Sequence, residues 1–269
     1  MYHIVAQCQS RWVELATREF FSTITIMKRL HTYSQNFLVS PRLVLELIGH
    51  SNLRKNDLVL DIGAGSGVIS SALARRVRRV IALEAEPRTA DKLRHNMMKF
   101  SNVEVVEADF LRWSLPRDRY KVFANIPFHL SSQIVQKLTT AEHPPRAIYL
   151  IVQRQFAKKL IIDQANFTGW LGASLAPWWT SRIRRPLQKT DFYPRPNVDT
   201  CLLELKLREQ PLLAVGRRPA YQAFVEKCFA QQKFFTGLDR ESVGISAEKK
   251  PSELTTAEWL KLFAKSLFL

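Results

Sequence analysis

The sequence predicts an α/β fold in which helices cover a mostly parallel β-sheet. Between residues 58 and 152, short apolar runs alternate with amphipathic stretches, and strands separated by helices of this length form βαβ units. The first apolar run ends in a glycine-rich loop, Gly63-Ala64-Gly65-Ser66-Gly67, directly before a helical pattern. Polar side chains end several of the runs, and such sheets bind ligands beyond the carboxyl ends of their strands. These observations indicate a Rossmann-like sheet with a ligand site at that edge.

Strands and helices are expected to alternate along most of the chain. Apolar runs predict strands at 58–62, 80–83, 103–106, 120–124 and 147–152. Helical patterns lie between them at 68–77, 87–100 and 131–138, and Pro87 suits the first turn of its helix. After residue 152 the alternation weakens, and 178–183 with 198–207 are expected to form a closing antiparallel hairpin. Amphipathic helices are expected at 221–229 and 254–263.

The expected domains are one large body, a small appendage and an extension. Residues 1–29 form the N-terminal extension, in which apolar residues at helical spacing indicate an amphipathic helix. Residues 30–210 are expected to form the Rossmann-like domain and residues 211–269 a small C-terminal helical domain. Pro-containing segments around 210–211 and 217–219 are typical of a linker between them.

The charge of the chain points to a polyanionic partner. Forty Lys and Arg against 24 Asp and Glu give a formal net charge of +16, which favours nucleic acid or an anionic membrane surface. No run of about 18 apolar residues occurs, so no membrane-spanning helix is expected. The three scattered cysteines fit a reducing compartment, and we expect a cytoplasmic protein. The histidines do not cluster with other ligands, so no metal is expected.

Acidic and amide side chains end successive predicted strands: Asp61, Glu84, Asp109 and Asn125. Glu84 lies about twenty residues after the glycine loop, where a carboxylate accepts from ribose hydroxyls. Val68 stands where a dinucleotide fingerprint has its third glycine, and no Lys-Ser or Lys-Thr pair of a nucleoside-triphosphate loop follows. A ribose-bearing ligand without phosphates therefore suits the loop better, and S-adenosylmethionine is one. The alternative is that Glu84 and Asp109 are solvated strand ends.

Asn125-Ile126-Pro127-Phe128 follows the apolar run 120–124. Proline fixes its own φ and keeps the preceding residue extended, which holds the Asn125 amide and nearby carbonyls at a fixed spacing. Phe128 offers a face on which a flat ring can stack. This set suits an enzyme that holds an amine-bearing ring beside a reactive group. The alternative is a plain turn in which Pro127 ends the strand and Phe128 packs inward.

With these motifs the chain resembles the ribosomal RNA adenine-N(6) dimethyltransferases, which include the Erm-type macrolide-lincosamide-streptogramin resistance enzymes and the KsgA-type small-subunit enzymes. The resemblance runs from about residue 31 to the C-terminus. It is carried by these separated motifs: Ser34-Gln35-Asn36-Phe37-Leu38, the Gly63 loop, Glu84, Asp109-Phe110, Asn125-Ile126-Pro127-Phe128 and 192–198. Ile126 and Phe128 favour the Erm branch, where the KsgA branch usually has Leu and Tyr. The long N-terminal extension and Glu86, in place of a common aspartate, depart from the family pattern.

The resemblance implies methyl transfer from S-adenosylmethionine to the N6 amine of a specific adenine in 23S ribosomal RNA, before or during ribosome assembly, by a monomer that confers macrolide resistance. Cofactor contacts would come from these residues: Asn36, Leu38, Gly63, Gly65, Glu84, Asp109, Phe110 and Asn125. Asn125, Ile126, Pro127 and Phe128 would form the catalytic motif. Phe128 and Phe192 would stack on the flipped adenine, Arg154 and Arg195 would contact the RNA, and the domain 211–269 would bind RNA.

Three other interpretations remain open at this point. A KsgA-type enzyme would modify small-subunit RNA with the same site. A nucleic-acid-binding factor could keep the scaffold without catalysis, although Glu84, Asn125 and Phe128 weigh against this. A nicotinamide-dependent oxidoreductase is disfavoured by the glycine spacing and by the charge.

Overall fold

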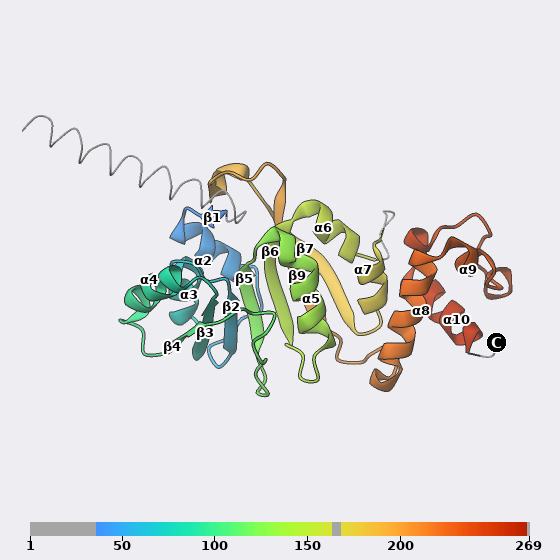
Figure 1. The fold of residues 1–269 in the computed structure, drawn as a ribbon, viewed down its shortest axis with the longest axis horizontal. Helices are drawn as coiled ribbons and strands as arrows, with labels where there is room; N and C mark the ends of the chain where they lie inside the picture. Colours follow the sequence, from blue (N-terminus) through green and yellow to red (C-terminus); the bar gives the residue numbers. More distant parts are fainter. Residues whose placement is uncertain (1–35, 163–167, 268–269) are drawn as a thin grey trace, which may run out of the picture. The chain divides into compact units, whose positions relative to one another are not determined.

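The computed structural model of the chain describes residues 36–162 and 168–267 (Figure 1). The chain divides into two units between Asn36 and Phe37, and the described residues belong to the second unit apart from Asn36. The expected N-terminal extension and its helix lie outside the described residues. No helix in the described ranges is long and apolar enough to span a membrane.

The core of the molecule is a seven-stranded sheet in the order β4-β3-β2-β5-β6-β9-β7. The strands are β2 Leu58–Ile62, β3 Arg79–Glu84, β4 Val103–Glu107, β5 Lys121–Asn125, β6 Ala147–Gln153, β7 Trp179–Leu187 and β9 Thr200–Leu207. The strands from β4 to β6 are parallel, and β9 runs antiparallel to both β6 and β7. The α/β fold expected from the sequence is confirmed.

The order of the strands reverses at β2, which pairs with β3 on one side and with β5 on the other. At such a switch point the connections leave in opposite directions, and a crevice opens beyond the carboxyl ends of the two strands. The glycine loop follows β2, and Asn125 ends β5. The sequence motifs thus lie at the switch point of the sheet.

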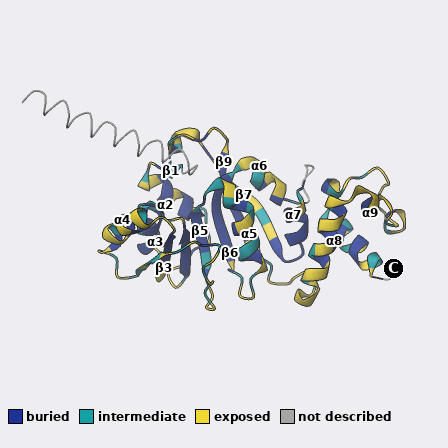
Figure 2. Ribbon diagram, in the orientation of Figure 1, coloured by how far each residue is buried: buried dark blue, intermediate teal, exposed yellow. Residues whose placement is uncertain are grey.

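Helices cover both faces of the sheet, because successive side chains of a strand point to opposite sides. One core cluster joins Val59, Val80 and Phe123 to the helices α2 Pro41–Gly49 and α3 Val68–Ala74, and α4 Pro87–Met97 packs by Ala82 on this side. The other cluster joins the alternate strand residues to α5 Ser131–Thr140, α6 Arg154–Leu160 and α7 Trp170–Leu175. Figure 2 shows the central strands buried between these helices, whereas the outer strands β4 and β7 are partly exposed.

The C-terminal helices continue the second core cluster beyond the sheet. They are α8 Arg218–Ala230, α9 Gln232–Thr236 and α10 Thr256–Ser266, with the short turns η3 Val215–Arg217, η4 Glu241–Val243 and η5 Pro251–Glu253. The ring of Tyr221 in α8 lies 5.6 Å from Trp178, before β7, and 5.2 Å from Phe263 in α10. Both expected helices are present, and the division into domains at residue 210 stays a prediction.

A two-stranded ribbon lies apart from the main sheet. It pairs β1 Phe37–Leu38 antiparallel with β8 Phe192–Tyr193, so that Phe37 faces Tyr193 and Leu38 faces Phe192. The short turn η2 Lys189–Asp191 precedes β8, and the Val39 N–H donates to the Asp191 carbonyl at 3.0 Å. The ribbon thereby joins the start of the described chain to the loop before β9.

Candidate active site

The glycine loop between β2 and α3 is closely packed. Gly63, Gly65 and Gly67 all have positive φ, at 68°, 56° and 91°, a region that side-chain-bearing residues enter only with strain. A Cβ on Gly65 would lie 3.2 Å from Phe37 Cε1, and one on Gly63 would lie 3.6 Å from Pro127 Cδ. The loop therefore fits between the β1–β8 ribbon and the Asn125 motif because its glycines carry no side chains.

Glu84, at the end of β3, ties this loop to the neighbouring strand end. Its side chain is buried, and one oxygen, Oε2, accepts from the Gly65 N–H at 2.9 Å. The other oxygen, Oε1, accepts from the N–H groups of Ala85 and Glu86 at 3.0 and 3.1 Å. Backbone donors thus fix the carboxylate, and lone pairs remain for hydroxyl donors from a ligand.

Asp61 is a fully buried carboxyl group at the start of the glycine loop. The Ser70 hydroxyl donates to its Oδ2 at 2.6 Å, whereas Oδ1 has no hydrogen-bond partner. Burial raises the pKa of Asp61 to about 7, a rise to which the nearby Glu84 also contributes and which the Ser70 bond opposes. A buried acceptor without a partner is costly and fits a cationic or donating ligand. The sequence placed Asp61 among the polar strand ends, but its sequence position gave it no separate role.

Asp109 and Phe110 follow β4 and differ in exposure. The Asp109 side chain is half exposed, and its Oδ1 accepts from the Leu111 N–H at 2.9 Å. Phe110 is buried in the core below α5. Lys137 of α5 donates to the carbonyls of Phe110, Leu111 and Trp113 at 2.8, 2.9 and 2.5 Å. Sequence reasoning missed Lys137, because a lysine on an amphipathic helix gives no signal of this kind.

The Asn125 motif turns the chain away from the sheet. Asn125 is half-buried at the end of β5, Ile126 is buried, and Pro127 lies against the glycine loop. Phe128 is half-buried and opens the turn η1 Phe128–Leu130, where its carbonyl accepts from the Ser131 hydroxyl at 2.9 Å. The ring of Phe128 is therefore neither fully packed inside nor fully solvated.

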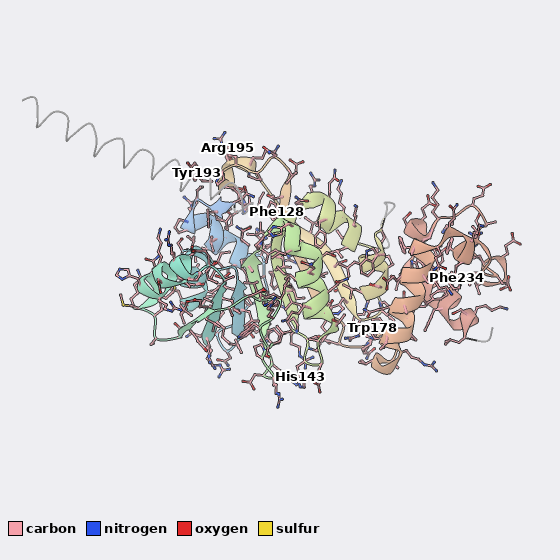
Figure 3. The ribbon with its side chains drawn as sticks, in the orientation of Figure 1. Phe128, His143, Trp178, Tyr193, Arg195 and Phe234 are labelled. Carbon is pink, nitrogen blue, oxygen red and sulfur yellow. The ribbon has the colours of Figure 1, made fainter. Side chains whose placement is uncertain are left out.

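The predicted RNA contacts differ in accessibility. Arg154 and Arg195 are exposed, and the Arg154 N–H donates to the Asp199 carbonyl at 2.8 Å, which holds the start of α6 against the 192–199 loop. Phe192 is only 2 % exposed and packs in the same cluster as Leu38. Figure 3 shows Phe128, Tyr193 and Arg195 in the upper part of the view and His143 in the lower part. The stacking role of Phe192 stays a prediction.

The structure brings most of the predicted cofactor residues to one edge. Gly65 and Glu84 are linked by a hydrogen bond, and Gly63 lies in the same loop. Asp109 follows the carboxyl end of β4, the strand that pairs with β3. Asn36 is half-buried directly before β1. Leu38 is buried between the ribbon and α2 rather than open to the edge.

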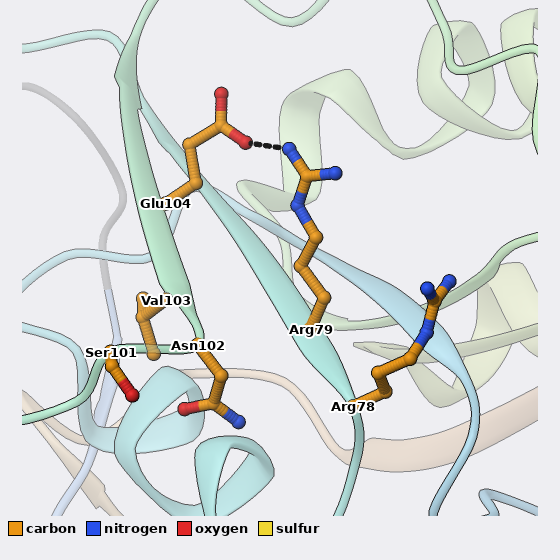
Figure 4. A pocket seen from close by; sticks show the side chains of 6 residues that line it. All are labelled: Arg78, Arg79, Ser101, Asn102, Val103 and Glu104. Carbon is orange, nitrogen blue, oxygen red and sulfur yellow. Dashed lines mark hydrogen bonds and ion pairs between the residues drawn. The ribbon is translucent and has the colours of Figure 1, made fainter.

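Two hollows are lined by residues outside the predicted site. One is lined by Arg78, Arg79, Ser101, Asn102, Val103 and Glu104, and Figure 4 shows the Arg79–Glu104 ion pair across it. It lies at the amino ends of β3 and β4, opposite the end that carries Glu84. The other lies between α2 and β7 and is lined in part by Arg42, Glu46 and Arg185. Neither contains any of the predicted site residues.

Comparison with known proteins identifies the family. The sequence profile described as "Ribosomal RNA adenine dimethylase" matches residues 27–251. The chain belongs to this family. An rRNA adenine N-6-methyltransferase of Staphylococcus aureus is 32% identical over 240 residues, which are 86% of this chain and 96% of that protein. The Ribosomal RNA small subunit methyltransferase A of Anoxybacillus flavithermus is 27% identical over 74% of this chain and 71% of its own length.

A solved structure supports the same family. The crystal structure of the 23S rRNA methyltransferase ErmE has a TM-score of 0.74 at 27% identity and covers 86% of this chain and 99% of that one. The protein is thus an S-adenosylmethionine-dependent rRNA (adenine-N6)-methyltransferase. Its switch-point edge fits the cofactor, since it holds a buried acceptor without a partner, a fixed carboxylate and a bare glycine backbone.

Proposed function

We propose that this methyltransferase modifies N6 of a specific adenine in 23S ribosomal RNA, acting as a cytoplasmic monomer before or during ribosome assembly. The structural match to the 23S enzyme ErmE, which covers 86% of this chain and 99% of that one, carries the proposal. The residues Ile126 and Phe128 of the Asn125 motif favour the Erm branch as well. Methylation of this kind would block a macrolide contact on the ribosome and so give antibiotic resistance.

The cofactor would lie across the carboxyl ends of β2 to β5. Glu84 would accept from the ribose hydroxyls, because its carboxylate is already oriented by backbone donors. Gly63 and Gly65 would leave space for the amino-acid part, while the predicted contact of Leu38 would require this buried side chain to open toward the edge and the contact of Asn36 stays a prediction. Asp109 would accept from the amine of the cofactor's adenine, with Phe110 packed beneath that loop.

The target amine is a weak nucleophile because its lone pair is delocalised into the ring. When bound, S-adenosylmethionine supplies a methyl group on a cationic sulfur. The Asn125 side-chain oxygen and a carbonyl near Ile126 would accept both amine protons and favour a more tetrahedral nitrogen. Pro127 holds this segment against the glycine loop, so the acceptors need no rearrangement during reaction.

No strong base is needed, because the product amine is acidic while it is cationic. The carboxyl groups of Asp61 and Glu84 give the edge a negative potential that would favour a sulfonium ligand. Alignment and electrostatics, rather than proton abstraction, would then carry the catalysis.

The adenine must leave its stack to reach this edge. Stacking on aromatic rings is worth about 1–3 kcal/mol per base, which is comparable with the cost of unstacking. Phe128 is the proposed aromatic partner, whereas Phe192 is buried in the core and its predicted stacking role would require it to leave that core. Arg154 and Arg195 are exposed beside the loop and would contact the RNA backbone.

The test is transfer of a labelled methyl group to separated, protein-free 23S and 16S rRNA, followed by digestion to nucleosides. The proposal expects label in N6-methylated adenine from 23S rRNA, and almost none with Asn125→Ala. Label in neither RNA would refute it.

Label in 16S rRNA alone would support the second candidate, a small-subunit enzyme. The 27% identity to the small-subunit methyltransferase of Anoxybacillus flavithermus favours that candidate. The two share the whole proposed site, so only the identity of the RNA separates them.

A further inference from the structure

Tyr193 is an aromatic residue that the proposed mechanism leaves without a role. Tyr193 is 64% exposed. The next most exposed aromatic residue in the described part of the chain is Trp170, at 37%. The neighbour of Tyr193, Phe192, is buried at 2%. Because neighbouring residues of a strand point to opposite sides, the pairing of β8 with β1 directs Phe192 inward and Tyr193 outward.

The loop that carries Tyr193 is held on both sides. Before it, the Gln188 N–H donates to Asp191 Oδ2 at 2.8 Å, and Val39 bonds to the Asp191 carbonyl. After it, Lys189 Nζ donates to the Asn197 carbonyl at 3.0 Å. Phe192 anchors the centre in the core. The exposed ring therefore stands on a fixed base, and little ordering would be needed when it binds a partner.

A short series of contacts connects Tyr193 to the active-site edge. Tyr193 pairs with Phe37, whose ring is 3.2 Å from the Cβ position of Gly65. Gly63 of the same loop lies against Pro127. Pro127 directly precedes Phe128. In Figure 3, Tyr193 and Arg195 lie at the upper edge of the view and Phe128 lies below them. Tyr193 is thus a second aromatic surface near the Asn125 motif, on the far side of the glycine loop.

The charges around the ring favour an anionic partner. Lys189 and Arg195 are exposed on the same loop, and Arg154 is exposed where α6 meets its end. Asp199 is exposed as well, whereas the carboxylate of Asp191 is engaged by Gln188. An exposed aromatic ring among cations is typical of surfaces that bind single-stranded nucleic acid, where bases stack and phosphates are neutralised.

We propose that Tyr193 is a stacking platform for the unpaired RNA base that neighbours the target adenine. This inference rests on the proposed rRNA methyltransferase function and adds a base-binding position outside the target pocket. Eversion of one base leaves its neighbour without a stacking partner, and Tyr193 replaces that partner. Phe192 then serves as the anchor that holds the platform in place.

The proposal is tested with a hairpin RNA taken from the rRNA that the enzyme methylates, in which 2-aminopurine replaces the base on either side of the target. Stacking on one aromatic ring corresponds to about 5- to 140-fold in affinity. Tyr193→Ala is expected to weaken hairpin binding within this range and to abolish the change in 2-aminopurine fluorescence at one neighbour. Tyr193→Phe keeps the ring and is expected to retain both.

Three controls separate stacking from other effects. Trp170→Ala removes an exposed aromatic of α7 and is expected to bind the hairpin normally. Arg195→Ala is expected to reduce the slope of log affinity against log salt by roughly 0.7–0.9, whereas Tyr193→Ala leaves that slope unchanged. Binding of S-adenosylhomocysteine by Tyr193→Ala is expected to equal that of the wild type, which excludes misfolding as the cause.

Wild-type affinity and fluorescence with Tyr193→Ala would overturn the proposal. So would a Tyr193→Phe variant as weak as Tyr193→Ala, since the hydroxyl rather than the ring would then matter. If the wild-type protein methylates neither rRNA, the proposed function itself fails, and this result is distinct from either outcome with the Tyr193 variants.

Discussion

Replacement of Glu84 by glutamine is the substitution that most sharply tests the cofactor edge. The carboxylate accepts from the N–H groups of Gly65, Ala85 and Glu86. Glutamine keeps a single acceptor oxygen. If that oxygen keeps the two bonds to Ala85 and Glu86, the new NH2 group faces the Gly65 N–H, and donor meets donor.

The size of the effect follows from the bonds that are lost. A hydrogen bond to a charged group contributes about 1.5–3 kcal/mol, and Glu84→Gln removes one such bond from a ribose hydroxyl. We therefore expect the Kd for S-adenosylhomocysteine to rise by about 10- to 150-fold. The loss of the Gly65 bond is expected to lower the free energy of unfolding as well, by about 1–3 kcal/mol.

Isothermal titration calorimetry measures the affinity, and urea unfolding measures the stability. The matched control is Glu86→Gln, two residues away, because the Glu86 side chain is exposed and accepts at the start of α4, where Thr89 donates to it. It is expected to bind S-adenosylhomocysteine like the wild type. A Glu84→Gln variant that binds within about threefold of the wild type would refute the reasoning, since the cost of one charged bond would be missing.

The other predictions concern three neighbouring residues. Asn125→Ala is expected to lose on the order of a hundredfold in single-turnover methylation, and a near-normal rate would reject its role. Because burial raises the pKa of Asp61 to about 7 in the folded protein, from an ordinary value of 3.8, its contribution to stability is full below about pH 4 and is lost as the pH rises to about 7. The free energy of unfolding, relative to Asp61→Asn, is therefore expected to fall over that window. A cationic cofactor favours the ionised form, so its binding is expected to release a proton below pH 7, and calorimetry in buffers of different ionisation enthalpy measures this. Lys137→Met removes the bonds to three carbonyls after Asp109 and is expected to weaken S-adenosylhomocysteine binding by about tenfold or more, while Lys92→Met, at an exposed position of α4, leaves it unchanged.

The parallel half of the fold was predictable because its strands are buried on both faces. Apolar runs of this kind mark central parallel strands, and β2 has the predicted bounds, 58–62. The position of β9 between β6 and β7 was not predictable in this detail. It depends on which strand edges meet after the chain has left the sheet, and no local pattern fixes that choice.

The polar strand ends were predictable for a similar reason, since parallel strands present all their carboxyl ends at one edge. The burial of Phe192 was not. It depends on pairing with Leu38, more than 150 residues earlier in the chain, and a two-residue strand gives no periodicity. Asp61 was recognised as a strand end, but only its unpaired Oδ1 shows that a ligand group is needed there.

The most direct measurement is a crystal structure of the protein with S-adenosylhomocysteine. The account predicts ribose hydroxyls on the Glu84 carboxylate, the adenine amine on Asp109, and the sulfur directed toward Asn125. A nucleoside found elsewhere, such as in the hollow beside Arg79 and Glu104, with the glycine loop empty in the same crystal, would contradict it.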